Sequence, residues 1–357
     1  MTRKELETLR IIPPEPSERK AVKQIWDQIA KPLDSLGTLE EMICRIGAIA
    51  GTTDIQLKKR AVLVMCADNG IVEAGISQTG QEVTAIVAEN MAKGISSVCR
   101  MAKLANAEVL PVDIGICGEK KLPGLLDKKV AAGTKNFLIE PAMTEEETLL
   151  AIETGMELVR DCRQQGYDIL ATGEMGIGNT TTSSAVAAAL LGRPVEELTG
   201  RGAGLSDEGL LRKRQTITLA LEKYDLLHAD AFTILFTVGG LDIAGLVGVF
   251  LGAGVYRIPV ILDGVISAVA ALLAERMVRG VREYMLASHV GREPAAAALL
   301  QALGLTPVIQ ADLALGEGTG AVMLLPLLDM ALSVYQANTT FSDIKVAQYQ
   351  RFQEGAP

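Results

Sequence analysis

A glycine-rich stretch at residues 173–182, GEMGIGNTTT, has the residue types and spacing that could bind a phosphate. It follows the apolar run 167–171, which predicts a buried strand, and it precedes the alanine-rich run 183–191, which predicts a helix. Glycines let a backbone approach a ligand closely, and a helix N-terminus offers N–H groups and a positive dipole end to an anion. The stretch therefore predicts a phosphate site, although a tight turn with no ligand has the same pattern.

The kind of phosphate follows from what this stretch lacks. It does not end in Lys-Ser or Lys-Thr, as nucleotide-triphosphate loops do, and its glycine spacing is not the dinucleotide fingerprint. A monophosphate is therefore the expected ligand. A phosphate would repel the carboxylate of Glu174, so we expect Glu174 to serve sugar hydroxyls or a cationic ring.

A second glycine loop, LGEGTG at residues 315–320, contains another carboxylate, Glu317. It precedes the apolar stretch 321–337, which predicts a helix. Glycine neighbours give a carboxylate no side chain to pack against, and a helix dipole stabilises it by at most about 1 kcal/mol. We therefore expect Glu317 to act as a catalytic acid or base.

Repeated units of strand, turn and helix must position these loops. Four apolar runs predict buried strands that end in glycine turns, at residues 61–67, 167–171, 232–238 and 259–262. Their alternation with helical patterns predicts an α/β fold with a parallel sheet. Ligands of such sheets bind beyond the carboxyl ends of the strands, so the turn at residues 68–70 is either a second wall of the site or a plain Asx turn.

Composition limits the class of protein. The chain has 357 residues, 49% of them hydrophobic, which suffices for one large core and a smaller unit. A net charge of −9 disfavours nucleic acid and anionic membrane as partners. Five scattered cysteines and two histidines predict neither a metal site nor a disulfide framework, and they fit a cytoplasmic location. We expect no targeting or membrane segment.

Several long motifs in the same order resemble the nicotinate-nucleotide–dimethylbenzimidazole phosphoribosyltransferases of cobamide biosynthesis. The resemblance covers nearly the whole chain, at residues 31–40, 67–70, 82–84, 174–181, 263–264, 288–294 and 315–320. It implies transfer of the phosphoribosyl group of nicotinate mononucleotide to 5,6-dimethylbenzimidazole or a related base. The products would be an α-ribazole 5′-phosphate and nicotinate, formed by one in-line displacement with inversion and without a cofactor.

The resemblance also implies residue roles. Glu317 would be the general base that accepts the benzimidazole proton, and Glu174 would lie near the ribose and the reaction centre. The other residues implied to bind substrate are Gly176, Gly178, Asn179, Thr180, Gly202, Lys213, Asp263, Ser77 and Gln81.

The implied fold is a Rossmann-like parallel sheet flanked by helices, with a smaller helical domain built from both chain ends. We expect residues 1–55 and 336–357 to form that smaller domain and residues 56–335 to form the α/β domain. Members of the family are usually homodimers, so we expect a homodimer here.

Three positions depart from the family pattern and leave the acceptor base open. Asn69, Gly80 and Asp242 stand where many relatives have His, Pro and Glu. One alternative is transfer to phenol or p-cresol by a heterodimer with a paralogous subunit. Another is a non-catalytic nucleotide-binding subunit, which would need neither Glu174 nor Glu317. A Rossmann-type oxidoreductase is disfavoured because the dinucleotide fingerprint is missing.

Overall fold

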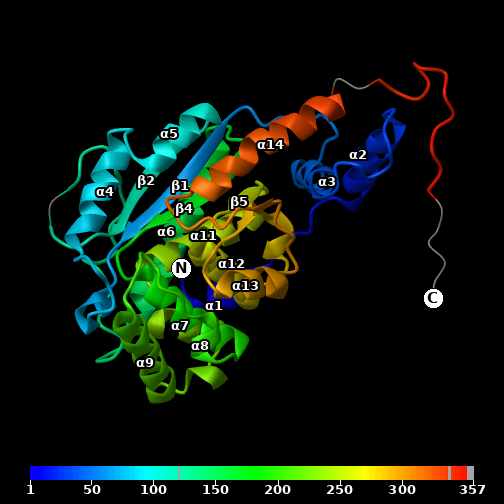
Figure 1. Cartoon of the computed structure of the whole chain (residues 1–357). Coiled ribbons are helices and arrows are strands. Elements are labelled where there is room, and N and C mark those ends of the chain that lie inside the picture. The colour runs from blue at the N-terminus through cyan, green and yellow to red at the C-terminus, as the bar shows by residue number, and fades with distance from the viewer. Residues whose placement is uncertain (120, 337–338, 352–357) are drawn as a thin grey trace.

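A parallel sheet of six strands forms the centre of the computed structural model, which describes residues 1–119, 121–336 and 339–351 (Figure 1). The strands lie in the order β3 (Leu126–Asp127), β2 (Glu108–Gly115), β1 (Arg60–Ala67), β4 (Ile169–Met175), β5 (Val260–Leu262) and β6 (Met285–Ala287). This is the strand order of doubly wound nucleotide-binding sheets. Strands β7 (His289–Val290) and β8 (Ile309–Gln310) form a separate parallel pair. The predicted α/β fold with a Rossmann-like sheet is confirmed.

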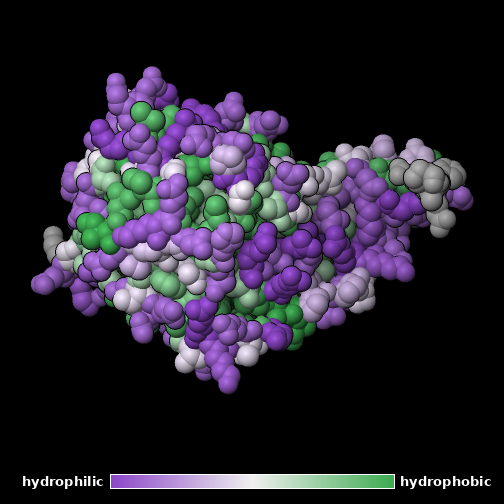
Figure 2. Space-filling model, turned by 90° about the horizontal axis from the view of Figure 1, so that it is seen from below, coloured by the Kyte–Doolittle hydropathy of each residue, from purple (hydrophilic) through white to green (hydrophobic). Residues whose placement is uncertain are grey.

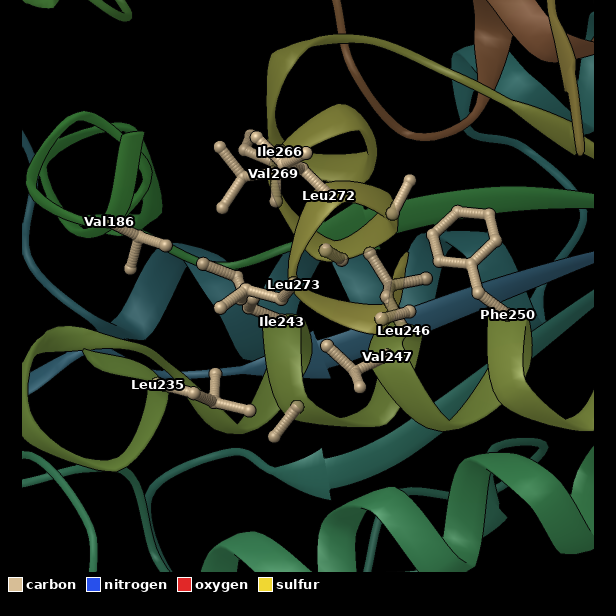
Figure 3. Packing of buried hydrophobic residues seen from close by; sticks show 14 of the residues in the cluster. Val186, Leu235, Ile243, Leu246, Val247, Phe250, Ile266, Val269, Leu272 and Leu273 are labelled. Atoms are coloured by element: carbon tan, nitrogen blue, oxygen red, sulfur yellow. The ribbon is translucent and has the colours of Figure 1, made fainter. Parts of the chain in front are cut away.

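Helices cover both faces of the sheet, and β1 shows how. Its Leu63 and Met65 pack in one apolar cluster and its Val62 and Val64 in another, because successive side chains of a strand point to opposite faces. Figure 3 shows part of the first cluster, where Leu235, Ile243 and Phe250 lie among neighbouring helices. The helices are α1 (Arg3–Thr8), α2 (Pro16–Gln28), α3 (Thr38–Ala50), α4 (Glu82–Ala92), α5 (Ser97–Leu104), α6 (Glu145–Gln164), α7 (Asn179–Leu191), α8 (Val195–Leu198), α9 (Asp207–Lys223), α10 (Ala231–Val238), α11 (Leu241–Tyr256), α12 (Val265–Met277), α13 (Ala295–Leu303) and α14 (Thr319–Gln336).

One of the four apolar runs described above as strands is not a strand. Residues 232–238 belong to helix α10, which begins where the Asp230 side chain accepts the N–H of Thr233 at 2.8 Å. A short apolar run has no periodicity that separates a buried strand from a buried helix, and here the N-terminal cap decides. The runs at 61–67 and 259–262 are strands, as predicted.

The boundaries around the first glycine loop also differ from the prediction. Strand β4 extends to Met175, so Glu174 lies on the strand and not in the loop. Helix α7 begins at Asn179, four residues before the predicted start. The connection between strand and helix is therefore only residues 176–178, which places Glu174 and the helix N-terminus close together.

Helices α2 and α3 project from the α/β body next to the far end of α14 (Figure 1). The rings of Trp26 and Tyr335 lie 5.2 Å apart, and Ile29 forms an antiparallel bridge with Thr340. Figure 2 shows that this projecting part is mostly hydrophilic at its surface. Helix α1, by contrast, packs on the α/β body through Leu6. Residues 337–338 and 352–357 of the predicted C-terminal segment, and with them the last residue of the helix predicted at 321–337, lie outside the described residues.

Helix α14 is long and apolar enough to cross a membrane by length and composition alone. In this molecule 56% of it is buried, against β4, β5 and α5. Its packing in the core accounts for its apolar composition.

Candidate functional site

A cavity of about 270 Å³ lies beyond the carboxyl ends of β4 and β5, where helices α7, α12 and α14 begin. Its walls bring together seven of the residues predicted from the sequence, which are Glu174, Gly176, Asn179, Thr180, Gly202, Asp263 and Glu317. Loops far apart in the sequence meet here because the parallel strands all end at the same edge of the sheet.

Lys213 on α9 lies behind one end of this cavity. Its side chain is fully buried, and its Nζ donates to Thr180 Oγ1, 3.0 Å away, on the cavity wall. Burial lowers the pKa of Lys213 to about 8, and the negative charge of Glu293 opposes that shift. A buried ammonium group behind a wall that carries a helix N-terminus gives this end of the site positive charge that can attract an anion.

Gly202 gives the Thr180 side chain the space it occupies. Its φ is +54°, and a Cβ at this position would lie 2.6 Å from Thr180 Oγ1. Its N–H donates to Glu293 Oε1 at 3.1 Å. Any other residue would strain the backbone and displace Thr180.

The start of helix α7 forms hydrogen bonds with both the preceding loop and Glu174. Gly178 adopts a φ of +95° as the residue before the helix. The backbone N–H of Asn179 donates to Gly176 O at 3.2 Å, and the Asn179 side-chain amide donates to Glu174 Oε2. Asn179 therefore orients the Glu174 carboxyl group.

Three carboxyl groups are buried close together here: those of Glu174 and Asp263 at the cavity wall and that of Asp242 behind Gly176. Burial, followed by the negative charges of Asp242 and Asp263, raises the pKa of Glu174 to about 8. Burial also raises the pKa of Asp242 to about 6. Glu174 is therefore mainly protonated at neutral pH until a positive charge comes close to it.

The loop that carries Glu317 has an uncommon backbone. Glu317 has a φ of +63° between Gly316 at +82° and Gly318 at +93°. A non-glycine residue in this region costs about 1 kcal/mol or more, so its surroundings must hold it there. Asp263 does so by accepting the N–H of Gly318 at 3.2 Å and the N–H of Ala321 at 3.0 Å.

The Glu317 side chain lies at the cavity wall and is half-buried. Its Oε2 accepts the N–H of Val98 at 3.0 Å, at the start of helix α5. Its own backbone N–H donates to the carboxyl group of Glu174. Thus the two carboxyl groups predicted to be catalytic meet in one cavity and are joined through the main chain.

Four residues of the predicted set do not line the cavity. Gly178 and Lys213 lie directly behind its wall. Ser77 accepts the N–H of Thr79 in its own loop, and Gln81 donates to Asn69 O at 3.2 Å.

The turn at residues 68–70 is also absent from the wall. Asp68 Oδ2 accepts the N–H of Cys117 at 2.8 Å, and Gly70 donates to Thr134 Oγ1 at 3.0 Å. Hydrogen bonds to the segments of Cys117 and Thr134 hold this turn in place, so of the two alternatives the structure favours a plain turn.

The cavity also has lining residues for which the sequence indicated no firm role. They are His289, Arg292, Glu293 and Thr319. The stretch 288–294 is part of the resemblance, so the sequence did signal it, but only the fold places Glu293 in contact with Gly202 at the cavity wall.

Comparison with known proteins agrees with this architecture. A family model described as Phosphoribosyltransferase matches residues 11–346. The nicotinate-nucleotide–dimethylbenzimidazole phosphoribosyltransferase of Ruminiclostridium cellulolyticum is 41% identical over 332 residues, which are 93% of this chain and 94% of the relative. The protein of that name from Acetivibrio thermocellus is 43% identical over 332 residues, 92% of this chain and 94% of the relative.

The crystal structure of CobT from Thermus thermophilus superposes with a TM-score of 0.88 at 39% identity. The match covers 94% of this chain and all of that structure. Sequence and fold therefore agree over nearly the whole length, and the chain belongs to the family of nicotinate-nucleotide–dimethylbenzimidazole phosphoribosyltransferases.

Proposed function

We propose that this protein transfers the phosphoribosyl group of nicotinate mononucleotide to 5,6-dimethylbenzimidazole, giving α-ribazole 5′-phosphate and nicotinate. Family membership supports the reaction. The observation that carries it within this chain is the placement of Glu317 and Glu174 in one cavity that also contains the N-terminus of α7, with the buried Lys213 behind it. A pure nucleotide-binding subunit would need neither carboxyl group.

The phosphate of the donor binds at the α7 end of the cavity. Lys213 supplies the charge through its contact with Thr180, and the α7 N-terminus supplies the positive dipole end. Gly176, Ile177, Asn179, Thr180 and Gly202, which line this end of the cavity, would surround the phosphate. This end holds the ribosyl carbon at a fixed distance from the acceptor, which is the main catalytic benefit of binding.

Glu174 responds to the charge of the donor. The pyridinium ring of nicotinate mononucleotide is positive, and its approach lowers the pKa of Glu174 from about 8, so the carboxyl group loses its proton. The resulting carboxylate stabilises the positive charge that develops at C1′ as the glycosidic bond breaks. Glu174 therefore acts on the sugar, while its neighbour Asn179 keeps it oriented.

Glu317 acts on the acceptor. One benzimidazole nitrogen attacks C1′ while the other gives its proton to the Glu317 carboxylate. The C1′–N bond of the donor breaks, and its electron pair neutralises the pyridinium ring, so nicotinate leaves without needing a proton. Because attack and departure occur on opposite faces of C1′, the β-linked donor gives an α-linked product.

The acceptor base and the assembly state are the finer parts of this proposal. We propose a homodimer in the cytoplasm that acts on a benzimidazole, with a phenol-directed heterodimer as the alternative. Incubating the purified chain alone with nicotinate mononucleotide and equimolar dimethylbenzimidazole, adenine, phenol and p-cresol tests it. We expect an α-ribotide of the benzimidazole, identified by chromatography and mass.

Two results would contradict this proposal. Phenolic products would move the chain to the phenol-directed alternative. No product from any acceptor would mean that the chain alone is not the enzyme, and a light-scattering mass would then show whether it is a monomer that lacks its partner subunit.

A further inference from the structure

A short chain of hydrogen bonds fixes the imidazole of His289 at the cavity wall. The Ser288 hydroxyl Oγ lies 2.5 Å from the backbone oxygen of Leu262 and 2.9 Å from His289 Nδ1. Ser288 is fully buried, and His289 is 5% exposed. His289 lines the cavity between residues 263–267 and 291–293.

The donors and acceptors in this series of hydrogen bonds determine which nitrogen of His289 carries the proton. A carbonyl oxygen only accepts, so the single hydroxyl proton of Ser288 goes to Leu262 O. Ser288 Oγ must then accept from the imidazole, which places the ring proton on Nδ1. The other nitrogen, Nε2, carries a lone pair and no proton.

The surroundings of the His289 ring keep it neutral, and the glycine at position 320 provides the space that it occupies. Burial lowers the pKa of His289, and the negative charge of Asp263 opposes this. Asp263 already accepts two backbone N–H groups of the Glu317 loop. A Cβ on Gly320 would lie 2.1 Å from His289 Nδ1, so only glycine at that position admits the ring where it is.

We infer that His289 Nε2 accepts a hydrogen bond from a ribose hydroxyl of the donor nucleotide. This inference rests on the proposed function. A neutral acceptor has no attraction for the phosphate or the carboxylate of nicotinate mononucleotide, which are themselves acceptors at neutral pH. The only hydrogen-bond donors left on that nucleotide are its 2′ and 3′ hydroxyls. The benzimidazole N–H is the other donor among the substrates, and it faces Glu317.

Donor nucleotides that lack one ribose hydroxyl test for this hydrogen bond to His289 Nε2. We would measure kcat/KM with nicotinate mononucleotide and with its 2′-deoxy and 3′-deoxy analogues, for the wild type, His289→Ala and Ser288→Ala. In the wild type, losing the hydroxyl that meets Nε2 should lower kcat/KM by roughly 5- to 100-fold, because a buried acceptor is left unpaired. In His289→Ala the same omission should change kcat/KM by less than about 3-fold.

Ser288→Ala separates this role from a structural one. It keeps the imidazole but removes the hydroxyl oxygen that holds the proton on Nδ1. The ratio of kcat/KM between nicotinate mononucleotide and its deoxy analogue should therefore become smaller but stay above one. His228→Ala is the matched control, because His228 has an 80% exposed side chain and does not line the cavity, and it should discriminate as the wild type does.

The inference is overturned if His289→Ala discriminates against both deoxy donors as strongly as the wild type. If His289→Ala does not fold, as judged by its melting curve, unchanged discrimination in Ser288→Ala overturns it equally. If the wild type transfers nothing, the proposed function fails. The ratios of dissociation constants for the three donors, measured by calorimetry, then still decide the role of His289.

Discussion

Asp263 holds the loop of Glu317 by its backbone, so it does not engage the Glu317 side chain. The carboxyl group of Asp263 accepts the N–H of Gly318 at 3.2 Å and that of Ala321 at 3.0 Å, on either side of the start of α14. Glu317 keeps its φ of +63° within this arrangement. A residue that directly follows β5 thus fixes the position of the proposed base.

Asp263→Asn should therefore lower both stability and turnover. One oxygen is replaced by an NH₂ group that faces a backbone N–H, and a buried group left without a partner costs about 1–3 kcal/mol in the free energy of unfolding. Urea unfolding and kcat measure the two effects. Asp230→Asn is the control, because Asn caps a helix as well as Asp does and α10 should keep its start. Normal kcat in a destabilised Asp263→Asn would show that Asp263 only supports the fold.

Glu317→Gln should lower kcat by roughly 10²–10⁴-fold, because Gln cannot accept the acceptor's proton. Its amide oxygen can still accept the Val98 N–H, so the loop should stay in place. Steady-state kinetics should show little change in the affinity for nicotinate mononucleotide. The exposed Glu140→Gln should behave as the wild type. If Glu317→Gln keeps its turnover, the proton goes to another group and this assignment is wrong.

Lys213→Met should raise the KM for nicotinate mononucleotide by roughly 10- to 100-fold, since a charged hydrogen-bond partner of the phosphate end is lost while the side-chain volume is kept. The effect on kcat should be smaller. Lys223→Met, on the same helix but exposed, is the matched control. An unchanged KM in Lys213→Met would mean that the buried lysine serves only the packing of α9 against α7.

Binding of the donor at pH 7 should release protons. The pKa of Glu174 is about 8, so at pH 7 its carboxyl group is protonated in the free protein. The positive pyridinium lowers this pKa, and the proton leaves. Lys213, whose pKa is also about 8, is already charged at pH 7 and therefore binds few additional protons. Calorimetric titration in buffers of different ionisation enthalpy measures the release.

The same titration of Glu174→Gln provides the comparison, because Gln has no proton to lose and Asn179 can still contact its side chain. The release should disappear in that variant. A release of equal size in Glu174→Gln would assign the proton to another group, with Asp242, whose pKa is about 6, as the next candidate.

We propose that α2, α3 and residues 339–351 form the smaller helical unit, with α1 belonging to the α/β body. Arg351 joins Asp27 at 2.7 Å and Asp34 at 2.7 Å, which ties the C-terminal segment to the α2–α3 pair. Trp26 is 1% exposed, so Trp26→Ala should lower the free energy of unfolding by about 3–5 kcal/mol, as truncations of buried aromatic side chains do.

Hydrogen exchange measures whether this loss stays local. In Trp26→Ala the amides of α2 and α3 should exchange faster while those of β1 and β4 keep their protection. Leu104→Ala, at a side chain that is 88% exposed, should change the exchange rates of neither group of amides. Equal loss of protection in β1 would mean that the two parts unfold as one.

Local sequence patterns were enough to predict most of the elements and the kind of chemistry. The glycines near Glu174 and Glu317 and the apolar runs predicted the α/β class and the loop that bears Glu317, but Glu174 proved to lie on strand β4. These signals are local, because backbone freedom and hydrophobic periodicity act within a few residues. The same locality explains the error at 232–238, where a short apolar run fits a strand and a buried helix equally well.

Which residues meet in space depends on the packing of the whole chain. That packing places Asp263 next to the Glu317 loop, Lys213 behind Thr180 and His289 at the cavity wall. It also packs other segments against the turn at 68–70. It also raises the pKa of Glu174 by burying it beside other carboxyl groups. Such effects depend on distance and burial in three dimensions, which arise as the chain packs around the sheet and are not present in any one stretch of sequence.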